Sequence, residues 1–513
     1  MATLYPTTSP EEAFRAAGAK FASMIDYLRT EEAMSAPEDK VSGWIAAHGR
    51  EVMRELLQGH LVVRAALEQR VEVRGREGVR RGRTRVSRRP LGSSFGLVNV
   101  WRFACQQPGV DGLHPMDGIL NLPPTLYSHV VCEMAAEASA MCSFEAASES
   151  VRKRTGLEIG KRQLEEMARS AATDFEAFYP QCTQEPESST DLLVLSFDGK
   201  GIVMREKDLR PATRRAAEQA VPKLAKRRSK GEKKDRKRMA EVATVYSIST
   251  HARTASDVLY GPANDDAGVK PRPYNKLVWA SVRDDMRTVI QRTFDEALRR
   301  DPGRRRRWVV LVDGNTDQLR HIKAAARRVG VKVTIVLDLM HVIEYLWKAA
   351  RKLFGEGDPK AWRWVTGRLR SLLEGRSGGA VARSIRRLAK KRGVSLDGKK
   401  NDVADCVRYL KNHTRYMHYD RALADGLPIA TGVVEGACRH LVARRMDAAR
   451  WSVNGAEAVL RLRALVLNGD FDAYWAFHLD RERHRNHASH YEGQVIPFPF
   501  SQDKRTATLM KFA

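Results

Sequence analysis

Two aspartates of this sequence, Asp198 and Asp313, each follow a short apolar run and precede a glycine. The two runs, 192–197 and 308–312, are rich in Val and Leu, which is typical of buried strands. Each strand is therefore expected to present a carboxylate where it ends. Two carboxylates held close together can bind a hard divalent cation such as magnesium. The alternative is that Asp-Gly only makes turns, because other aspartates in the chain precede glycine without an apolar run.

Two further acids follow the same logic. The run 331–337 ends at Asp338, and His341 is expected to face it across the first turn of a helix. Asp338 can act there as the helix N-cap, with His341 as a buried hydrogen-bond partner. Glu435 lies near the start of another helical pattern, beside its apolar stripe. An acid in that position can compensate the helix dipole or serve as a third metal ligand.

The charge of the chain points to a polyanionic partner. The 513 residues include 89 Lys and Arg against 62 Asp and Glu, which gives a formal net charge of +27. Nucleic acid is the leading candidate. We expect no membrane association, because no apolar run could span a bilayer and no signal segment opens the sequence. The six cysteines include no C-x-x-C pair, so we expect neither a zinc ribbon nor a disulfide framework. This favours a location in the cytoplasm, in association with the nucleoid.

Two basic segments could contact a phosphate backbone. Residues 74–89 lead into the alternating stretch 95–101, and together they could form a DNA-contacting β-hairpin or a solvated loop before an edge strand. Residues 205–238, which include Arg227 and Arg228, are strongly basic and poor in apolar residues. Such a segment is either a solvated loop or a binding surface for the phosphate backbone, and we favour the binding surface.

The patterning divides the chain into six regions. Residues 1–127 form a mainly helical and β-hairpin region, 128–182 a helical region, 191–349 the first part of an α/β domain, 350–430 an all-α insertion, 431–470 the glutamate-bearing part of that domain, and 471–513 a C-terminal tail. Within 128–182, a break at Gly156 separates two helices that could form a helix-turn-helix motif. Its second helix, beginning near Lys161 and Arg162, would then enter a major groove. The alternative is a packed helical hairpin.

The order of the expected strands predicts a fold for the α/β domain. Stretches 192–198, 201–205 and 241–248 read as an antiparallel meander. The later runs at 308–312 and 331–337 alternate with helical patterns, so they are expected to pair in parallel. Three meander strands followed by β-α-β-α is the order of a ribonuclease H-like mixed sheet.

Several short motifs, taken as an ordered set, resemble a known family. They are Asp198-Gly-Lys-Gly, the stretch 237–246, Val312-Asp-Gly-Asn315, Asp338-Leu-Met-His341, Gly432-Val-Val-Glu435, Arg445-Met and Arg450-Trp451. The set is similar to bacterial insertion-sequence DDE transposases of the Kra-type group, which are distantly similar to Mutator-like transposases. The resemblance covers about residues 90 to 470.

This resemblance implies a function and a site. The catalytic and metal-binding triad would be Asp198, Asp313 and Glu435, with Asp338 and His341 as an accessory motif. The cofactor would be two Mg²⁺ or Mn²⁺ ions, and the partner would be double-stranded DNA at transposon ends and target, bound by a homo-oligomer. Some related transposases carry a C-x-x-C element near the amino terminus, but no such element occurs near Cys105, so we expect no zinc.

The chemistry of phosphodiester cleavage points to the same residues independently of the family resemblance. Phosphodiester cleavage and transfer need two hard cations about 4 Å apart, held by oxygen ligands. Clustered carboxylates repel one another, which favours cation uptake. Lys200 is expected to contact phosphate, as are Arg445 and Arg450 in the motifs above. Trp451 could stack on an unpaired base at a cleaved end, or it could be a core residue.

Two other functions remain open on this sequence. One is a ribonuclease H-like nuclease or resolvase that cuts DNA without joining it. The other is a non-catalytic DNA-binding protein derived from a transposase, against which the intact carboxylates argue. Outside the proposed triad, Asp317 and Glu457 are expected to tolerate replacement by the corresponding amide.

Overall fold

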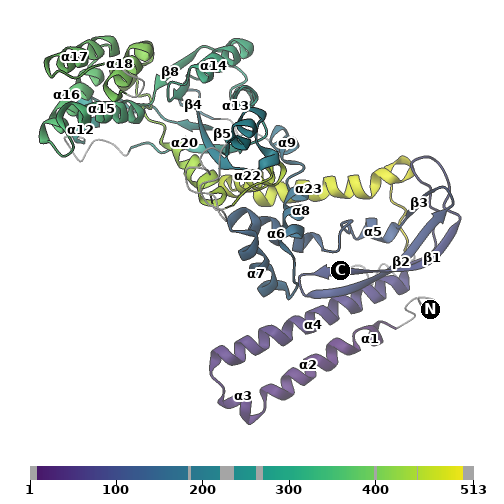
Figure 1. Cartoon of the computed structure of the whole chain (residues 1–513). Coiled ribbons are helices and arrows are strands. Elements are labelled where there is room, and N and C mark those ends of the chain that lie inside the picture. Colours follow the sequence, from purple (N-terminus) through teal and green to yellow (C-terminus); the bar gives the residue numbers. More distant parts are fainter. Residues whose placement is uncertain are drawn as a thin grey trace. The chain divides into compact units, whose positions relative to one another are not determined.

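The computed structural model describes residues 9–182, 187–219, 236–261, 270–397, 401–447 and 449–500 (Figure 1). The chain forms two compact units, one made of residues 1–180 with 469–513 and the other of residues 181–468. Each unit is described by itself. In the described parts of the chain, no helix combines the length and the hydrophobicity needed to cross a lipid bilayer.

The first unit opens with helices and an antiparallel sheet. The helices are α1 (Pro10–Ala13), α2 (Arg15–Leu28), α3 (Glu31–Ser35) and α4 (Glu38–Leu67), and the strands are β1 (Arg83–Ser93), β2 (Gly96–Gln107) and β3 (Val110–Leu113). Strands β1 and β2 pair along their whole length as a hairpin. Leu61 of α4 packs against Leu91 and Val98 of this hairpin. The N-terminal region is therefore mainly helical with a β-hairpin.

Shorter helices complete the first unit. They are α5 (Pro115–Ile119), α6 (His129–Met141), α7 (Phe144–Thr155), α8 (Lys161–Ala171), α9 (Phe175–Phe178) and α23 (Phe471–Asn486). The break expected at Gly156 is present, because this glycine ends α7 in the left-handed conformation. A second break, which the sequence analysis missed, falls at Ser143, whose side chain caps α7. Val131, Val151 and Leu164 join α6, α7 and α8 in one small core.

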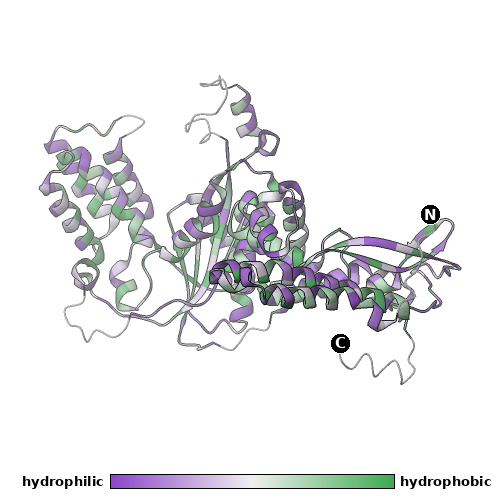
Figure 2. Cartoon of the chain, turned by 90° about the horizontal axis from the view of Figure 1, so that it is seen from below, coloured by the Kyte–Doolittle hydropathy of each residue, from purple (hydrophilic) through white to green (hydrophobic). Residues whose placement is uncertain are grey.

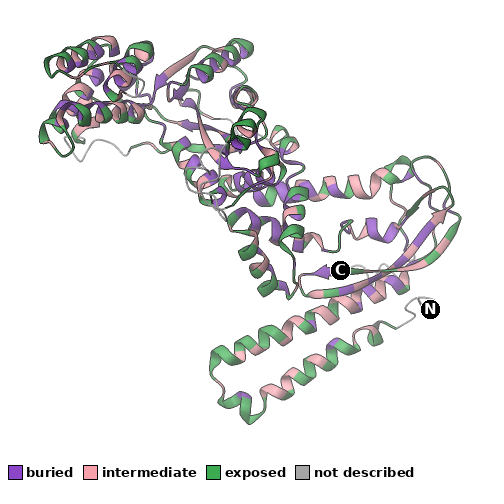
Figure 3. Ribbon diagram, in the orientation of Figure 1, coloured by how far each residue is buried: buried purple, intermediate pink, exposed green. Residues whose placement is uncertain are grey.

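The second unit is built on a five-stranded mixed sheet. Its strands are β4 (Leu192–Val203), β5 (Lys237–Ile248), β6 (Tyr274–Ser281), β7 (Trp308–Val312) and β8 (Val333–Leu337), in the order β6-β5-β4-β7-β8. Strands β4, β5 and β6 are antiparallel neighbours, whereas β7 and β8 run parallel to β4. All of β7 is buried, and Figure 3 shows buried residues in purple along the strands of this sheet. The expected mixed α/β architecture is thus confirmed.

The meander differs from the prediction in one respect. The two strands expected at 192–198 and 201–205 are a single strand, β4, and β6 is the third strand instead. Strand β5 pairs with β4 along its whole length, so the chain does not turn after Asp198. Side chains of the neighbouring strand also lie close to the two glycines there. A Cβ atom at Gly199 would lie 2.8 Å from the Met239 side chain, and one at Gly201 would lie 2.8 Å from Lys237.

Helices surround the sheet and extend beyond it. They are α10 (Pro211–Glu218), α12 (Ala255–Tyr260), α13 (Met286–Arg300), α14 (Thr316–Val329), α15 (Leu339–Phe354), α16 (Pro359–Leu373), α17 (Gly378–Lys391), α18 (Asp402–His413), α19 (Tyr419–Ala424), α20 (Gly432–Ala437), α21 (Arg444–Met446) and α22 (Val453–Asn468). A π-helical turn, Cys438–Ala443, joins α20 to α21. Apolar and polar residues alternate along α15 to α18 (Figure 2), as expected of helices with one buried face.

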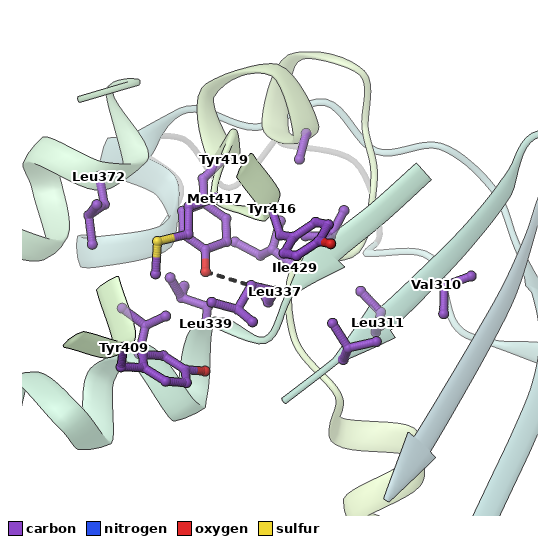
Figure 4. Close-up of a cluster of buried hydrophobic side chains, with 14 of the residues drawn as sticks. Val310, Leu311, Leu337, Leu339, Leu372, Tyr409, Tyr416, Met417, Tyr419 and Ile429 are labelled. Atoms are coloured by element: carbon purple, nitrogen blue, oxygen red, sulfur yellow. Dashed lines mark hydrogen bonds between the residues drawn. The ribbon is translucent and has the colours of Figure 1, made fainter. Parts of the chain in front are cut away.

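The all-α region shares its core with the sheet. Buried residues of β7, β8 and helices α15 to α18 form one continuous apolar cluster. Figure 4 shows Met417, Tyr419 and Ile429 packed beside Leu337 and Leu339 at the end of β8. The Tyr419 hydroxyl donates a hydrogen bond of 3.0 Å to the Leu337 carbonyl oxygen. The helices after residue 350 are therefore bound to the strands that carry the acidic residues.

One buried acid connects α22 to the end of β6. The Glu457 carboxylate accepts hydrogen bonds from the Ser281 hydroxyl at 2.9 Å and from the backbone N–H groups of Val282 at 2.9 Å and Arg283 at 3.1 Å. Its side chain is buried, with the Arg461 guanidinium 3.3 Å away. The expectation that Glu457 tolerates an amide is therefore not supported, whereas the exposure of Asp317 is compatible with the same expectation for that residue.

Replacement of Glu457 by Gln should destabilise the second unit. The amide nitrogen cannot accept the hydrogen bonds that this carboxylate receives, and the ion pair with Arg461 is lost, at a cost of roughly 3 kcal/mol. Thermal unfolding should show a Tm several degrees lower for Glu457→Gln. Asp317→Asn should leave the Tm unchanged, and an equal Tm for both variants would contradict this role.

Candidate metal centre at the ends of the parallel strands

Three aspartates occupy one row across the parallel strands. The last residue pair between the parallel strands β4 and β7 joins Ser196 to Leu311. If the same register is continued by two residues, Asp198 comes to lie opposite Asp313. Continued by one residue, the pairing of β7 with β8 sets Asp338 level with Asp313. Neighbouring strands lie about 4.8 Å apart. The strand registers therefore lead the three aspartates to the same edge of the sheet, although Asp198 lies within β4 and not at its end as predicted.

The Asp198 side chain is held from both sides. Its Oδ1 accepts a hydrogen bond of 2.6 Å from the Gly199 N–H, and its Oδ2 accepts one of 3.1 Å from the Cys438 thiol. Burial, reinforced by the charge of Asp198, raises the pKa of Cys438, so this thiol stays protonated as a donor. Cys438 begins the π-helical turn, a feature that often marks functional sites.

Asp313 is positioned by the helical region that follows the sheet. The Tyr409 hydroxyl of α18 donates a hydrogen bond of 2.7 Å to the Asp313 carbonyl oxygen. Nε2 of His413 lies 2.8 Å from the Gly314 carbonyl oxygen, and Gly314 has a φ of +97°. A Cβ atom at Gly314 would lie 3.0 Å from this imidazole. The Asn315 N–H donates a hydrogen bond of 2.8 Å to Asp313 Oδ1, which orients the carboxylate.

Asp338 is the buried N-cap of α15. It accepts hydrogen bonds of 3.3 Å from the N–H groups of Met340 and His341 and of 3.0 Å from that of Thr431. Its Oδ2 also lies 2.6 Å from Nδ1 of His341. Burial alone would raise the pKa of Asp338, but the hydrogen bonds from His341 and Thr431 outweigh it, and the pKa is lowered. The N-cap interpretation is therefore correct, with His341 half-buried as its partner.

Glu435 lies with this pair. One donor atom from each of Asp338, His341 and Glu435 falls within 4.8 Å of the others. The Glu435 side chain is exposed and accepts a hydrogen bond of 3.2 Å from the Thr431 hydroxyl. Across the described residues, Asp198, Asp313 and Glu435 do not form a cluster of that tightness. Among the described residues, the glutamate therefore groups with the accessory pair.

A fifth acid, Glu241, lies in the strand next to β4. It lies opposite Gly199 in β5 and is partly buried, so its side chain lies on the face of the sheet opposite to that of Asp198. Burial raises its pKa, and the charge of Asp198 acts in the same direction, although Arg210 opposes them. The signal in the sequence was a single acid in an otherwise apolar strand. No comparable signal pointed to Tyr409 or His413, whose roles depend on the fold.

The basic residues expected to bind DNA differ in accessibility. Lys200 is half-buried and follows Asp198 in β4, and Arg450 is exposed. In the first unit, Lys161 and Arg162 are exposed at the start of α8, with Glu145 at 3.2 Å from the former and Glu166 at 3.1 Å from the latter. Arg227 and Arg228 lie outside the described residues.

Trp451 and Arg445 are core residues in this structure. The Trp451 side chain is buried, and its indole N–H donates a hydrogen bond of 3.0 Å to the Met446 carbonyl oxygen. The Arg445 guanidinium is also buried and lies 4.8 Å from the centre of the Trp451 ring. This burial does not fit the base stacking expected of Trp451 or the phosphate contact expected of Arg445. It fits the alternative that Trp451 is a core tryptophan.

Comparisons with known proteins do not identify the chain. No protein-family model matches it, and a search of curated proteins found no similar sequence.

The pKa of His341 provides a direct test of the geometry. The hydrogen bond to Asp338 raises it from 6.5 to about 9, with the charges of Asp338 and Asp313 adding to this and burial opposing it. Without divalent cations, this contribution to stability should therefore be complete below pH 6.5 and lost as the pH rises through about 9. An NMR titration of the His341 ring should give a midpoint near 9. In Asp338→Asn the midpoint should fall toward 6.5, and a wild-type midpoint near 6.5 would contradict the hydrogen bond.

Proposed function

We propose that this protein is a metal-dependent DNA transposase with a ribonuclease H-like catalytic domain. The observation that carries the proposal is that Asp198 lies on β4 while Asp313 and Asp338 directly follow β7 and β8, the parallel strands next to it. Glu435 reaches the same end of the sheet from a helix. The strand order β6-β5-β4-β7-β8, with an antiparallel meander and two parallel strands, supports the fold part of this proposal. The net charge of +27 suits a nucleic-acid substrate.

The donor atoms of this centre fit two magnesium or manganese ions. Asp198, Asp313 and Glu435 offer carboxylate oxygens, the ligands that these cations prefer. When bound, two such ions would activate an attacking oxygen and stabilise the leaving oxygen of a phosphodiester.

The surrounding residues orient the carboxylates and contact the substrate. The Cys438 thiol and the Gly199 N–H fix Asp198, while Asn315 fixes Asp313. The Thr431 hydroxyl orients Glu435. Lys200, two residues beyond Asp198, would contact the phosphate backbone. Such preorganisation supplies most of the catalysis in phosphoryl transfer, because the protein itself forms no covalent bond to the substrate.

Amide substitutions test the catalytic assignment. Asp198→Asn, Asp313→Asn and Glu435→Gln keep the size of the side chain and remove the charge that holds the cations. Metal-dependent cleavage of a DNA duplex that carries the element's ends should fall roughly a thousandfold or more, at about 1.4 kcal/mol for each factor of ten. Duplex affinity should be retained, because it depends on the basic residues.

Asp317→Asn is the matched control for this test. Asp317 lies four residues beyond Asp313 and is exposed, so cleavage should be near normal. Near-normal cleavage by any of the three triad variants would refute the assignment at that position. Products in which a cleaved end is joined to target DNA distinguish a transposase from a nuclease that only cuts.

The salt dependence of DNA binding tests the partner. Each phosphate neutralised by Lys or Arg should contribute roughly −0.9 to the slope of log affinity against log salt concentration. Binding of the whole protein to any duplex should therefore weaken steeply between low and moderate salt. Fluorescence anisotropy with a labelled duplex measures the slope. An affinity that does not change with salt would contradict the proposal that the basic residues bind nucleic acid.

A further inference from the structure

The exposed side of α17 carries positive charge alone. No Asp or Glu occurs in the sequence between Glu374 and Asp397, and this stretch contains the whole helix. Five residues of α17 are exposed, and all five are cations. They form the surface that we call the α17 basic face, namely Arg383, Arg386, Arg387, Lys390 and Lys391. Spacings of three and four residues place them beside one another on the helix.

The opposite side of α17 is fixed in the core of the second unit. Val381, Ile385 and Ala389 are buried in the same apolar cluster as strands β7 and β8. The helix packs against α18 (Figure 1), and a Cβ atom at Gly378 would lie 2.7 Å from the Leu410 carbonyl oxygen of that helix. Because its apolar side is buried, α17 cannot insert into a lipid surface as a free amphipathic helix does. Its cations therefore remain turned toward solvent.

The α17 basic face has no acidic partner in the described parts of the chain, where none of its five cations forms an ion pair. Exposed arginines elsewhere in the second unit do have such partners. Arg328 of α14 lies 2.6 Å from Asp295, and Arg408 of α18 pairs with Asp405. Like charges three and four residues apart on a helix repel one another. This arrangement therefore destabilises α17 unless an anion from outside the protein compensates the charge.

Compensation of the helix dipole accounts for only part of this charge. Lys390 and Lys391 lie in the last turn of α17, where cations stabilise a helix. Arg383, Arg386 and Arg387 precede that turn, and the dipole effect does not extend to them. The three arginines therefore require another partner.

We propose that the α17 basic face binds the phosphate backbone of duplex DNA. This inference rests on the proposed function for the choice of DNA, and it adds a contact surface outside the metal centre. Arg and Lys neutralise phosphates whatever the base sequence, so the contact is not sequence-specific. The exposed side of α17 has no aromatic ring on which an unpaired base could stack, which favours a duplex over a single strand. The face belongs to the same unit as the carboxylates, and its neighbour α18 carries Tyr409, which bonds to Asp313.

The salt dependence of duplex binding by a triple variant tests the face. Arg383→Gln, Arg386→Gln and Arg387→Gln, combined in the full-length protein, remove three exposed cations. If each contacts one phosphate, the slope of log affinity against log salt concentration should become less negative by roughly 2.7, or 0.9 per contact. Fluorescence anisotropy with a labelled duplex measures the slope. Circular dichroism and Tm should equal those of the wild type, because the replaced side chains have no partner in the fold.

A matched control removes three positive charges from other exposed sites. Arg152, Arg320 and Arg328 are exposed and pair with Glu149, Asp317 and Asp295. Their combined replacement by Gln lowers the net charge equally and should leave the slope as in the wild type. Equal slopes for the α17 variant and the wild type would overturn the inference. So would tighter binding of an RNA duplex of the same length that the α17 substitutions weaken.

Chemical modification locates the contact independently. Bound duplex should slow the acetylation of Lys390 and Lys391, measured by mass spectrometry, and leave that of Lys153 unchanged, since Lys153 is exposed in the first unit. Equal acetylation rates with and without DNA would show that the duplex does not cover the α17 basic face.

Failure of this inference is distinguishable from failure of the proposed function. A wild type that binds and cleaves DNA, with an α17 variant of unchanged slope, overturns the inference alone. A wild type whose binding depends on the α17 basic face but that shows no metal-dependent cleavage overturns the catalytic proposal and supports the contact. A wild type that does not bind duplex DNA overturns both.

Discussion

The parallel pairing of β4, β7 and β8 is the constraint on which the proposed catalytic centre depends. A change of one residue in either register would move an aspartate to the other face of the sheet, because side chains alternate along a strand. The register is secured by buried apolar residues of these strands, most of which belong to one core. Hydrophobic packing in the middle of the sheet therefore determines which carboxylates meet at its edge.

The electrostatic repulsion between neighbouring carboxylates accounts for the hydrogen-bond donors around them. Asp198, Asp313, Asp338 and Glu435 would repel one another in a partly buried site. Each of the three aspartates accepts a backbone N–H hydrogen bond, and a thiol or an imidazole reinforces two of them. These neutral or positive donors stabilise the ionised carboxylates before any cation binds. The same donors also limit the orientations that the side chains can adopt.

Local patterns were enough to predict part of this structure. Apolar runs that end in Asp-Gly located β7 and Asp313, and helical periodicity located the N-cap at Asp338. Long-range pairing was not predictable in the same way. The continuation of β4 past Asp198 depends on β5, and the burial of Glu457 and Trp451 depends on Ser281 and Met446. The closeness of Glu435 to His341 was likewise not predictable, because the sequence around each residue gives no information about the other.

The hydrogen bonds from α18 to the turn at Asp313 make the helical region part of the centre. Tyr409 and His413 hold the carbonyl groups of Asp313 and Gly314, and Tyr419 holds that of Leu337. Two neighbouring strand ends are thus tethered to the same set of helices. Any partner that shifts these helices changes the separation of two carboxylates, so occupancy of their outer surface and cation affinity are thermodynamically linked. The helices between residues 350 and 424 can therefore change the cation affinity of the centre as well as hold its residues in place.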